Sequence, residues 1–149
     1  MLYTILLLIH VLAAIIGIGA TFAFPVISNS AKNLPQLKHI LVLVKKLELY
    51  PKIGGALLII TGLMMGFISP GYFKEIWFMG SIALYIIIEI LIYGVIGSKM
   101  KKIVPVVMTS VGEKIPEEYQ LVAKSTAPIH MVASLLAIVI IILMSVKPF

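Results

Sequence analysis

The sequence contains no cysteine, no aspartate and no arginine, and only 12% of its 149 residues are charged. Without cysteine, the chain has no disulfide, no thiolate metal site, no covalent CxxCH haem attachment and no thiol nucleophile. It also lacks an HExxH, a GxSxG and a P-loop motif, and its glutamates form no acidic cluster for a divalent cation. Hydrolysis and phosphoryl transfer therefore have no evident machinery.

Hydrophobic residues make up 61% of the chain, and they gather in four long stretches. Crossing a hydrocarbon core of roughly 30 Å takes about 20 helical residues. Because lipid offers no partner for free backbone groups, each stretch is predicted to be an α-helix. We predict an all-α integral membrane protein, a four-transmembrane-helix bundle that forms a single domain over residues 1–149. The predicted spans are 2–27, 53–69, 76–98 and 125–146.

The lysines are distributed unevenly around these spans. Of the 12 lysines, five follow the first span and five follow the third. The positive-inside rule therefore predicts that both termini are extracytoplasmic, in a multi-pass protein of the plasma membrane. Tyr72 and Trp77 lie where an outer aromatic belt is expected. The net charge of +6 then reflects a membrane surface, and no nucleic-acid partner is expected.

The two lysine-rich segments are predicted to be amphipathic and cytoplasmic. In the first, Asn33 can cap a helix with Pro35 in its first turn, and apolar residues recur at helical spacing opposite lysines. We expect an interfacial helix that ends near Pro51. In the second segment, Pro116 precedes two glutamates, which suits a helix N-terminus. The last helix is therefore expected to begin before the membrane does.

Each span has one face of small or polar residues at intervals of three or four positions, a face that lipid does not favour. We expect these faces to point inward and to let helices pack closely. The GxxxG pair Gly62 and Gly66 suits packing within the chain and also a homodimer, and both readings stay open. In chain order the faces are His10, Ala13, Ala14, Gly17 and Thr21; Gly55, Gly62, Gly66 and Ser69; Ser81, Tyr85, Glu89, Tyr93 and Gly97; and Thr126, His130 and Ser134.

Glu89 stands near the centre of the third span. A carboxylate there costs about 2.5 to 3.5 kcal/mol on insertion scales, so it is expected to be protonated, paired with a histidine or facing water. Tyr85 and Tyr93, one turn away on either side, are its expected hydrogen-bond partners, and Ser134 is assigned to the same polar network. A buried acid that only sets the helix register is the alternative.

His10 and His130 are the candidate cofactor ligands. Neutral imidazole binds haem iron and other metals, and helix bundles often hold a cofactor between inward histidines. We expect haem b, bound non-covalently, with copper as the alternative. Helix rise predicts an axial offset of about 10 Å between the two side chains. Both on one iron, one histidine as the sole ligand, and purely structural histidines therefore stay open, and no catalytic residue is assigned.

The run HVLAAIIGIGATFAFPVI, which starts at His10, resembles the opening of a group of small bacterial membrane proteins. The group includes the DUF2269 predicted integral membrane proteins, the CopD copper-resistance proteins and the HemJ-type protoporphyrinogen oxidases. In length and layout the chain is most similar to DUF2269, through GGALLIITGLMMG in the second helix and IWFMGSIALY in the third. The resemblance implies a membrane fold and assigns no activity.

The two other families imply specific cofactors. Resemblance to the HemJ-type proteins implies that His10 is an iron ligand. Gly80 and Ser81 stand where the third-helix lysine of those proteins is expected, so the resemblance does not extend to porphyrinogen oxidation. Resemblance to the CopD proteins implies copper, but the methionines of this chain are scattered and suit core packing.

Three classes of function follow from these residues. The first is a haem-binding bundle for electron transfer or sensing, an oxidoreductase-like role whose respiratory or quinone partner is unassigned. The second is a proton-coupled transporter of a small solute or metal that uses Glu89. The third is a non-catalytic assembly or structural protein. Whether the protein is an enzyme stays open, and the lipid bilayer is the one partner that all three share.

Overall fold

The computed structural model describes residues 1–148, apart from the side chain of Thr21. These residues form helices and no strand, which confirms the all-α prediction. In chain order the helices are α1 (Leu2–Asn29), α2 (Leu34–Leu47), α3 (Leu49–Ile68), the 3₁₀ helix η1 (Pro70–Lys74), α4 (Ile76–Glu89), the π-helix η2 (Ile90–Ile96), α5 (Gly97–Thr109) and α6 (Glu117–Val146).

Within the described residues, four helical stretches are long and apolar enough to cross a membrane: Leu2–Asn29, Leu34–Ile68, Ile76–Thr109 and Glu117–Val146. Large apolar side chains cover their outer surfaces. Ile15, Phe67 and Met131 are 65%, 73% and 66% exposed. Such exposure is costly in water but suits hydrocarbon, where no hydrophobic force drives these side chains inward. The prediction of four helices of membrane length is therefore confirmed, and α6 begins ahead of its predicted span as expected.

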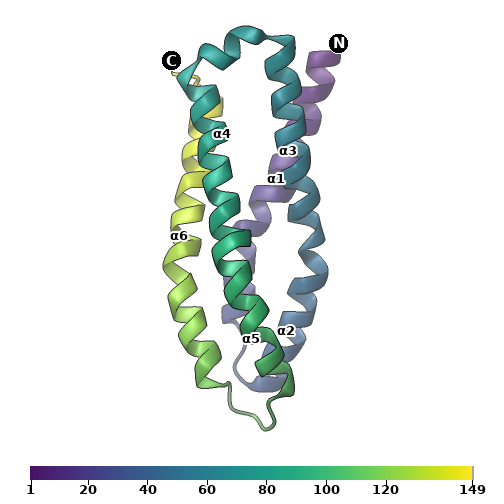
Figure 1. Ribbon diagram of the computed structural model, residues 1–149. Helices are drawn as coiled ribbons and strands as arrows, with labels where there is room; N and C mark the ends of the chain where they lie inside the picture. Colours follow the sequence, from purple (N-terminus) through teal and green to yellow (C-terminus); the bar gives the residue numbers. More distant parts are fainter. Residues whose placement is uncertain (149) are drawn as a thin grey trace.

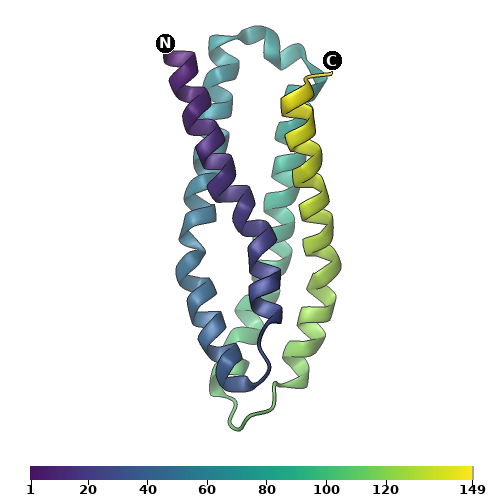
Figure 2. The same cartoon turned by 180° about the vertical axis from the view of Figure 1, so that it is seen from behind.

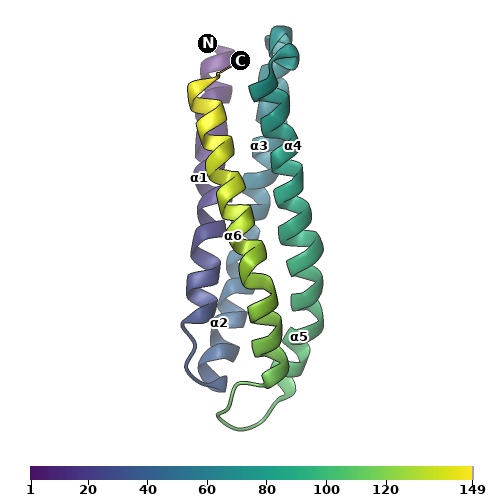
Figure 3. The ribbon, with the colours of Figure 1, turned by 90° about the vertical axis from the view of Figure 1, so that its left-hand side faces the viewer.

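The helices pack as two pairs that run side by side (Figure 1). α1 packs most extensively against α3, and α4 packs against α6. A smaller contact between α1 and α6 joins the pairs. Figure 2, seen from behind, shows α1 crossing in front of α3, and Figure 3 shows it running beside α6. Ile88, Ala133, Ala137 and Ile140 form a buried apolar cluster between α4 and α6.

α2 and α3 form one nearly unbroken rod (Figure 1). The amide of Glu48, between them, donates to the carbonyl of Val44 at 2.9 Å. At 1.5 Å per residue the rod is about 52 Å long, roughly 20 Å more than a hydrocarbon core. The prediction of an interfacial helix is therefore wrong, because α2 continues along the axis of the membrane-length helix α3. Pro51 lies in the first turn of α3, where a missing amide proton is tolerated.

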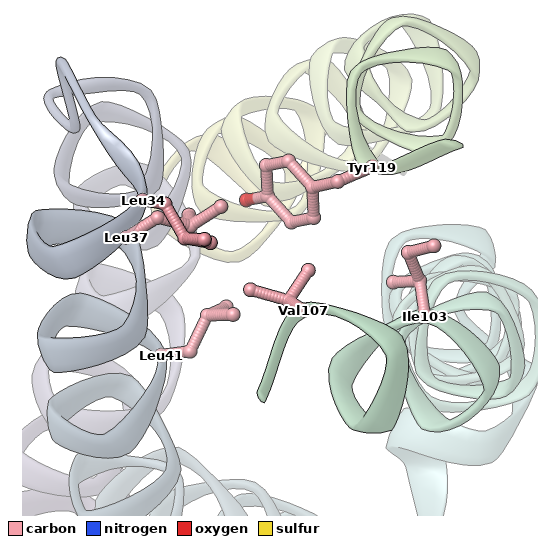
Figure 4. Close-up of a cluster of buried hydrophobic side chains, with 6 residues drawn as sticks. All are labelled: Leu34, Leu37, Leu41, Ile103, Val107 and Tyr119. Carbon is pink, nitrogen blue, oxygen red and sulfur yellow. The ribbon is translucent and has the colours of Figure 1, made fainter. Parts of the chain in front are cut away.

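The two ends of the bundle differ in character. The start of α1 and the end of α6 lie at one end, which we call the terminal end, and the lysine-rich segments lie at the other, the lysine-rich end (Figure 1). At the lysine-rich end, α2, α5 and the start of α6 enclose a small apolar core (Figure 4). It consists of Leu34, Leu37, Leu41, Ile103, Val107 and Tyr119. Both predicted amphipathic segments thus bury their apolar faces against each other.

At the terminal end, aromatic rings close the bundle. Tyr72 packs edge-on against Trp77 with ring centroids 5.2 Å apart, and its hydroxyl lies 3.1 Å from that of Tyr3. The Lys147 ammonium lies 5.3 Å from the centroid of the Trp77 ring. Trp77 is only 5% exposed. Tyr72 and Trp77 thus lie together at this end, but Trp77 packs inward instead of facing lipid, so it does not contribute to the predicted aromatic belt.

Candidate membrane-embedded polar site

Glycines bring α1 and α3 into backbone contact. A methyl group placed on Gly54 would lie 2.6 Å from the backbone nitrogen of Gly17 and 2.9 Å from the carbonyl oxygen of Ala13. A methyl group on Gly17 would in turn lie 3.2 Å from the nitrogen of Gly55. The small-residue face of α1 therefore packs against α3 as predicted. The side chain of Thr21, the last residue of that face, lies outside the part that the structure describes.

About two turns further toward the terminal end, the His10 ring of α1 hydrogen-bonds Thr61 of α3. The distance from His10 Nδ1 to Thr61 Oγ1 is 2.8 Å, and the same hydroxyl donates to the Leu57 carbonyl at 2.6 Å. A hydroxyl has a single proton to donate. Because that proton goes to Leu57, Nδ1–H of His10 is the donor to Thr61, and Nε2 carries the ring's lone pair. Gly62 leaves room for the ring, whose Cε1 would lie 3.3 Å from a methyl group there.

Thr61 was not predicted as a site residue, although a signal was present. It is the only polar side chain between Lys52 and Ser69. It is also 3% exposed. A lone hydroxyl in an apolar span can satisfy itself by donating to the preceding turn, so sequence alone does not reveal that it also accepts from another helix.

Replacing Thr61 by valine is expected to lower the free energy of unfolding by about 1 to 3 kcal/mol, because it leaves the Nδ1–H of the half-buried His10 without an acceptor. Thr109 is the matched control, since its hydroxyl also donates to a preceding carbonyl, Pro105 at 3.0 Å, but lies exposed on α5. Denaturation of both variants in detergent measures the difference. Equal stabilities of Thr61→Val and Thr109→Val would contradict the cross-helix hydrogen bond.

Glu89 and Tyr85 of α4 face α3 at Gly55. A methyl group on Gly55 would collide with the Tyr85 hydroxyl and lie 3.3 Å from Glu89 Oε1. Glu89 and Tyr85 are both half-buried. The Glu89 carboxylate and the Tyr85 hydroxyl thus lie at the same place on α3. Glycine at position 55 leaves room for both polar groups between the two helix pairs.

The polar face continues toward the lysine-rich end through a π-helix. η2 begins directly after Glu89 and contains Tyr93, and the amide of Gly97 donates to the carbonyl of Ile92, five residues earlier. The Lys52 ammonium of α3 lies 5.7 Å from the centroid of the Tyr93 ring and 2.8 Å from Glu48. Short π-helical segments are frequent at functional sites. We call Tyr85, Glu89, Tyr93 and Lys52 the polar column.

The predicted polar residues of α6 are less well satisfied. Thr126 is buried, and its hydroxyl donates to the Val122 carbonyl at 3.0 Å. Nδ1 of His130 is buried and has no hydrogen-bond partner among the described residues. Ser134, one turn further along, is half-buried and makes no side-chain hydrogen bond to another described residue. Glu89 and Tyr85 thus meet at Gly55, and the place of Ser134 in the same polar network stays a prediction.

His10 and His130 lie at different depths. Tyr3 and Lys147 both contact Tyr72, so they mark one level at the terminal end. His10 follows Tyr3 by seven residues and His130 precedes Lys147 by 17 residues. At 1.5 Å per residue, the two histidines are about 15 Å apart along the bundle, more than the sequence-based value of about 10 Å. A single iron cannot take both as axial ligands in this arrangement.

The GxxxG glycines pack within the chain. Gly62 receives the His10 ring, and a methyl group on Gly66 would lie 2.8 Å from Phe78 and 2.9 Å from Phe73. Both glycines are buried, so they offer no free dimerisation face. Among the described residues, no three His, Cys, Asp or Glu side chains gather to hold a metal ion. Haem iron, in contrast, takes four ligands from the porphyrin and needs only one or two from protein.

Comparison with known proteins gives one family. The family model of DUF2269, described as a predicted integral membrane protein, matches residues 4–148. No curated protein and no solved structure matches the chain. The family description agrees with the four membrane-length helices.

Proposed function

The chain belongs to the DUF2269 family of predicted integral membrane proteins, and on that premise we propose that it moves protons through the membrane by way of Glu89. The observation that carries this proposal is the placement of the Glu89 carboxylate. It lies within a membrane-length helix, beside the Tyr85 hydroxyl, and faces the backbone of α3 at Gly55. Ionisable side chains inside membrane spans are rare and commonly mark proton or ion pathways.

The groups around Glu89 suit proton transfer. A carboxylate can bind and release a proton, and a tyrosine hydroxyl can donate and accept a hydrogen bond at the same time. Toward the lysine-rich end, Tyr93 and the Lys52–Glu48 ion pair continue the column to an exposed surface. The polar column therefore supports a path from that surface to Glu89.

Toward the terminal end, His10 extends the same path. The His10 ring lies against Gly62 of α3, and Gly62 is seven residues from Gly55, which Tyr85 and Glu89 face. The ring is therefore about 10 Å from these two side chains along the bundle, on the side of the terminal end. An imidazole at that position supports a second half of the path, from Glu89 toward the terminal end.

Purified protein reconstituted into vesicles that contain a pH-sensitive dye tests the proposal. Under an imposed pH gradient with a potassium diffusion potential, vesicles with protein are expected to change internal pH faster than protein-free vesicles. The membrane potential drives net proton movement, so the absence of flux cannot be attributed to a missing driving force. Equal rates with and without the protein, in both directions of the gradient, would overturn the proposal.

Haem binding through His10 is a second candidate function, and the His10–Thr61 hydrogen bond favours it. Ligating histidines usually donate their other ring N–H to a fixed acceptor, which orients the ring and raises its basicity. Thr61 is such an acceptor, and the Nε2 lone pair of His10 is then available to iron. Haem would supply one-electron chemistry when bound. A copper ion would need further protein ligands around His10.

Protein expressed with haem available is expected to show a Soret band, and His10→Ala is expected to reduce haem content by at least roughly tenfold, since an outer-shell change alone costs about 10- to 100-fold in affinity. His130→Ala and His39→Ala are expected to retain the band, because His130 lies about 15 Å away along the bundle and His39 is exposed on α2. Absorption spectra of oxidised and reduced protein measure this. A colourless parent protein that binds no haem on titration would contradict haem binding. An equal loss of the Soret band in all three variants would contradict His10 as the ligand.

A further inference from the structure

Two adjoining depressions lie at the lysine-rich end, away from the polar column. The larger has a volume of about 460 Å³ and is lined by Lys32, Asn33, Glu113, Lys114, Ile115 and Gln120. The depression is open, and all of its lining residues except Ile115 are polar or charged. The rim is held in place: the Leu34 amide donates to the Glu113 carbonyl at 2.8 Å, and the Lys38 ammonium donates to the Ser110 carbonyl at 2.8 Å.

The cations of the larger depression are free to bind an anion. Among the described residues, neither Lys32 nor Lys114 has a carboxylate within ion-pair distance, and the ion pair that does form is Lys52 with Glu48. Glu113 lies on the same rim, so the side-chain charge there is two positive and one negative. Asn33 and Gln120 add neutral polar groups. Lysine beside neutral hydrogen-bonding side chains is a common arrangement for phosphate.

The amides at the start of α2 do not form this site. The Gln36 amide is taken by the Asn33 side chain at 3.0 Å, and the Leu37 amide by the Asn33 carbonyl at 3.0 Å. The Leu34 amide is taken by Glu113. Any anion in the depression would therefore be bound by lysine side chains, whose length lets them reach a ligand from both walls.

The smaller depression leads from the first toward the membrane-spanning helices. Its volume is about 220 Å³, and it shares Ile115 and Gln120 with the larger one. Ser28 at the end of α1 and Ala123 and Lys124 of α6 line its far side. These positions adjoin the expected membrane boundaries of their spans. A polar, cationic pocket thus joins a partly apolar crevice that opens between α1 and α6.

We propose that this pair of depressions binds one anionic phospholipid, with the phosphate beside Lys124 and Ala123, near the expected membrane boundary, and with the Lys32 and Lys114 side chains reaching toward it from the larger depression. Basic pockets between membrane helices at the cytoplasmic surface bind anionic headgroups. The lysine-rich end is the end predicted to be cytoplasmic. Three lysines against Glu113 give the charge complementarity. The crevice toward α1 and α6 distinguishes a lipid from a free phosphate, since an inorganic anion has no chains to place there.

The test uses the full-length protein in vesicles of equal parts phosphatidylglycerol and phosphatidylcholine, extracted in mild detergent, with retained lipid measured by mass spectrometry. The parent is expected to retain phosphatidylglycerol in about tenfold preference, and the double variant Lys32→Gln, Lys114→Gln to lose that preference. The control double variant Lys101→Gln, Lys102→Gln removes the same charge from exposed positions of α5 and is expected to keep it.

Three outcomes would overturn the proposal. Equal retention of both lipids by the parent means that no anionic lipid is selected. An equal loss of preference in both double variants means that the general charge of this end is responsible, without a site. Displacement of phosphatidylglycerol by excess inorganic phosphate means that the depression recognises a free phosphate and not a lipid. Folding of each variant is checked by its elution profile, so that a misfolded protein is not counted.

Discussion

Replacing Glu89 by glutamine is expected to reduce the proton flux of reconstituted protein to the level of protein-free vesicles. Glutamine has nearly the shape of glutamate and can still hydrogen-bond Tyr85, but it cannot bind and release a proton at neutral pH. The change also removes an ionisable group from a membrane span, which lowers the cost of inserting that helix. The variant is therefore expected to fold, and loss of flux is separable from loss of structure.

Glu75→Gln is the matched control for this experiment. Glu75 lies between η1 and α4 at the terminal end, outside the polar column, and its amide donates to the Tyr72 carbonyl at 3.0 Å. The same chemical change there is expected to leave the flux within about twofold of the parent, as surface substitutions away from structural features usually have small effects. Parental flux in the Glu89→Gln protein would show that protons take another route.

Replacing Gly54 by alanine is expected to have the largest effect on stability, a loss of roughly 3 kcal/mol in the free energy of unfolding. The added methyl group would lie 2.6 Å from the Gly17 nitrogen and 2.9 Å from the Ala13 carbonyl oxygen. These are backbone atoms, so no side-chain rotation relieves the contact, and α1 must move away from α3. Denaturant titration in mixed micelles measures the loss.

Gly19→Ala is the control for Gly54→Ala. It makes the same change in a spanning helix at a position where no atom lies within 4 Å of the added methyl group. Alanine is the better helix former by about 1 kcal/mol, so this variant is expected to be as stable as the parent or slightly more stable. If Gly54→Ala were equally stable, α1 and α3 would not approach each other as closely as described.

Much of the site was open to prediction from residue spacing. The intervals that connect Tyr85, Glu89 and Tyr93 placed them on one inward face, because residues four apart in a helix share a side. What the spacing could not supply was the opposite wall. Gly55 lies against Tyr85 and Glu89, and the Lys52 ammonium lies over the Tyr93 ring, because the long side chains of one helix pair reach α3 of the other. The π-helix after Glu89 likewise has no marker in its residues.

The histidines show the same division. His10 and His130 were both predicted to face inward, and His10 does face α3, where it meets Thr61. The sequence-based separation of about 10 Å was counted from the edges of the predicted spans, whereas the value of about 15 Å is counted from the contacts at Tyr72. The two differ because the helices extend beyond the predicted spans.

The sequence by itself determined that the chain forms four helices of membrane length, with both termini at one end and the lysines concentrated at the other. That much follows from local physics, because a bilayer requires helices of a given length, and the helical period shows which residues share a face. The tertiary structure decided which faces meet: Gly54 with Gly17, Thr61 with His10, and Gly55 with Glu89. All four spans carry a similar face of small or polar residues, so the sequence pattern does not show which face meets which. Close packing of whole helices selects among the possible pairings.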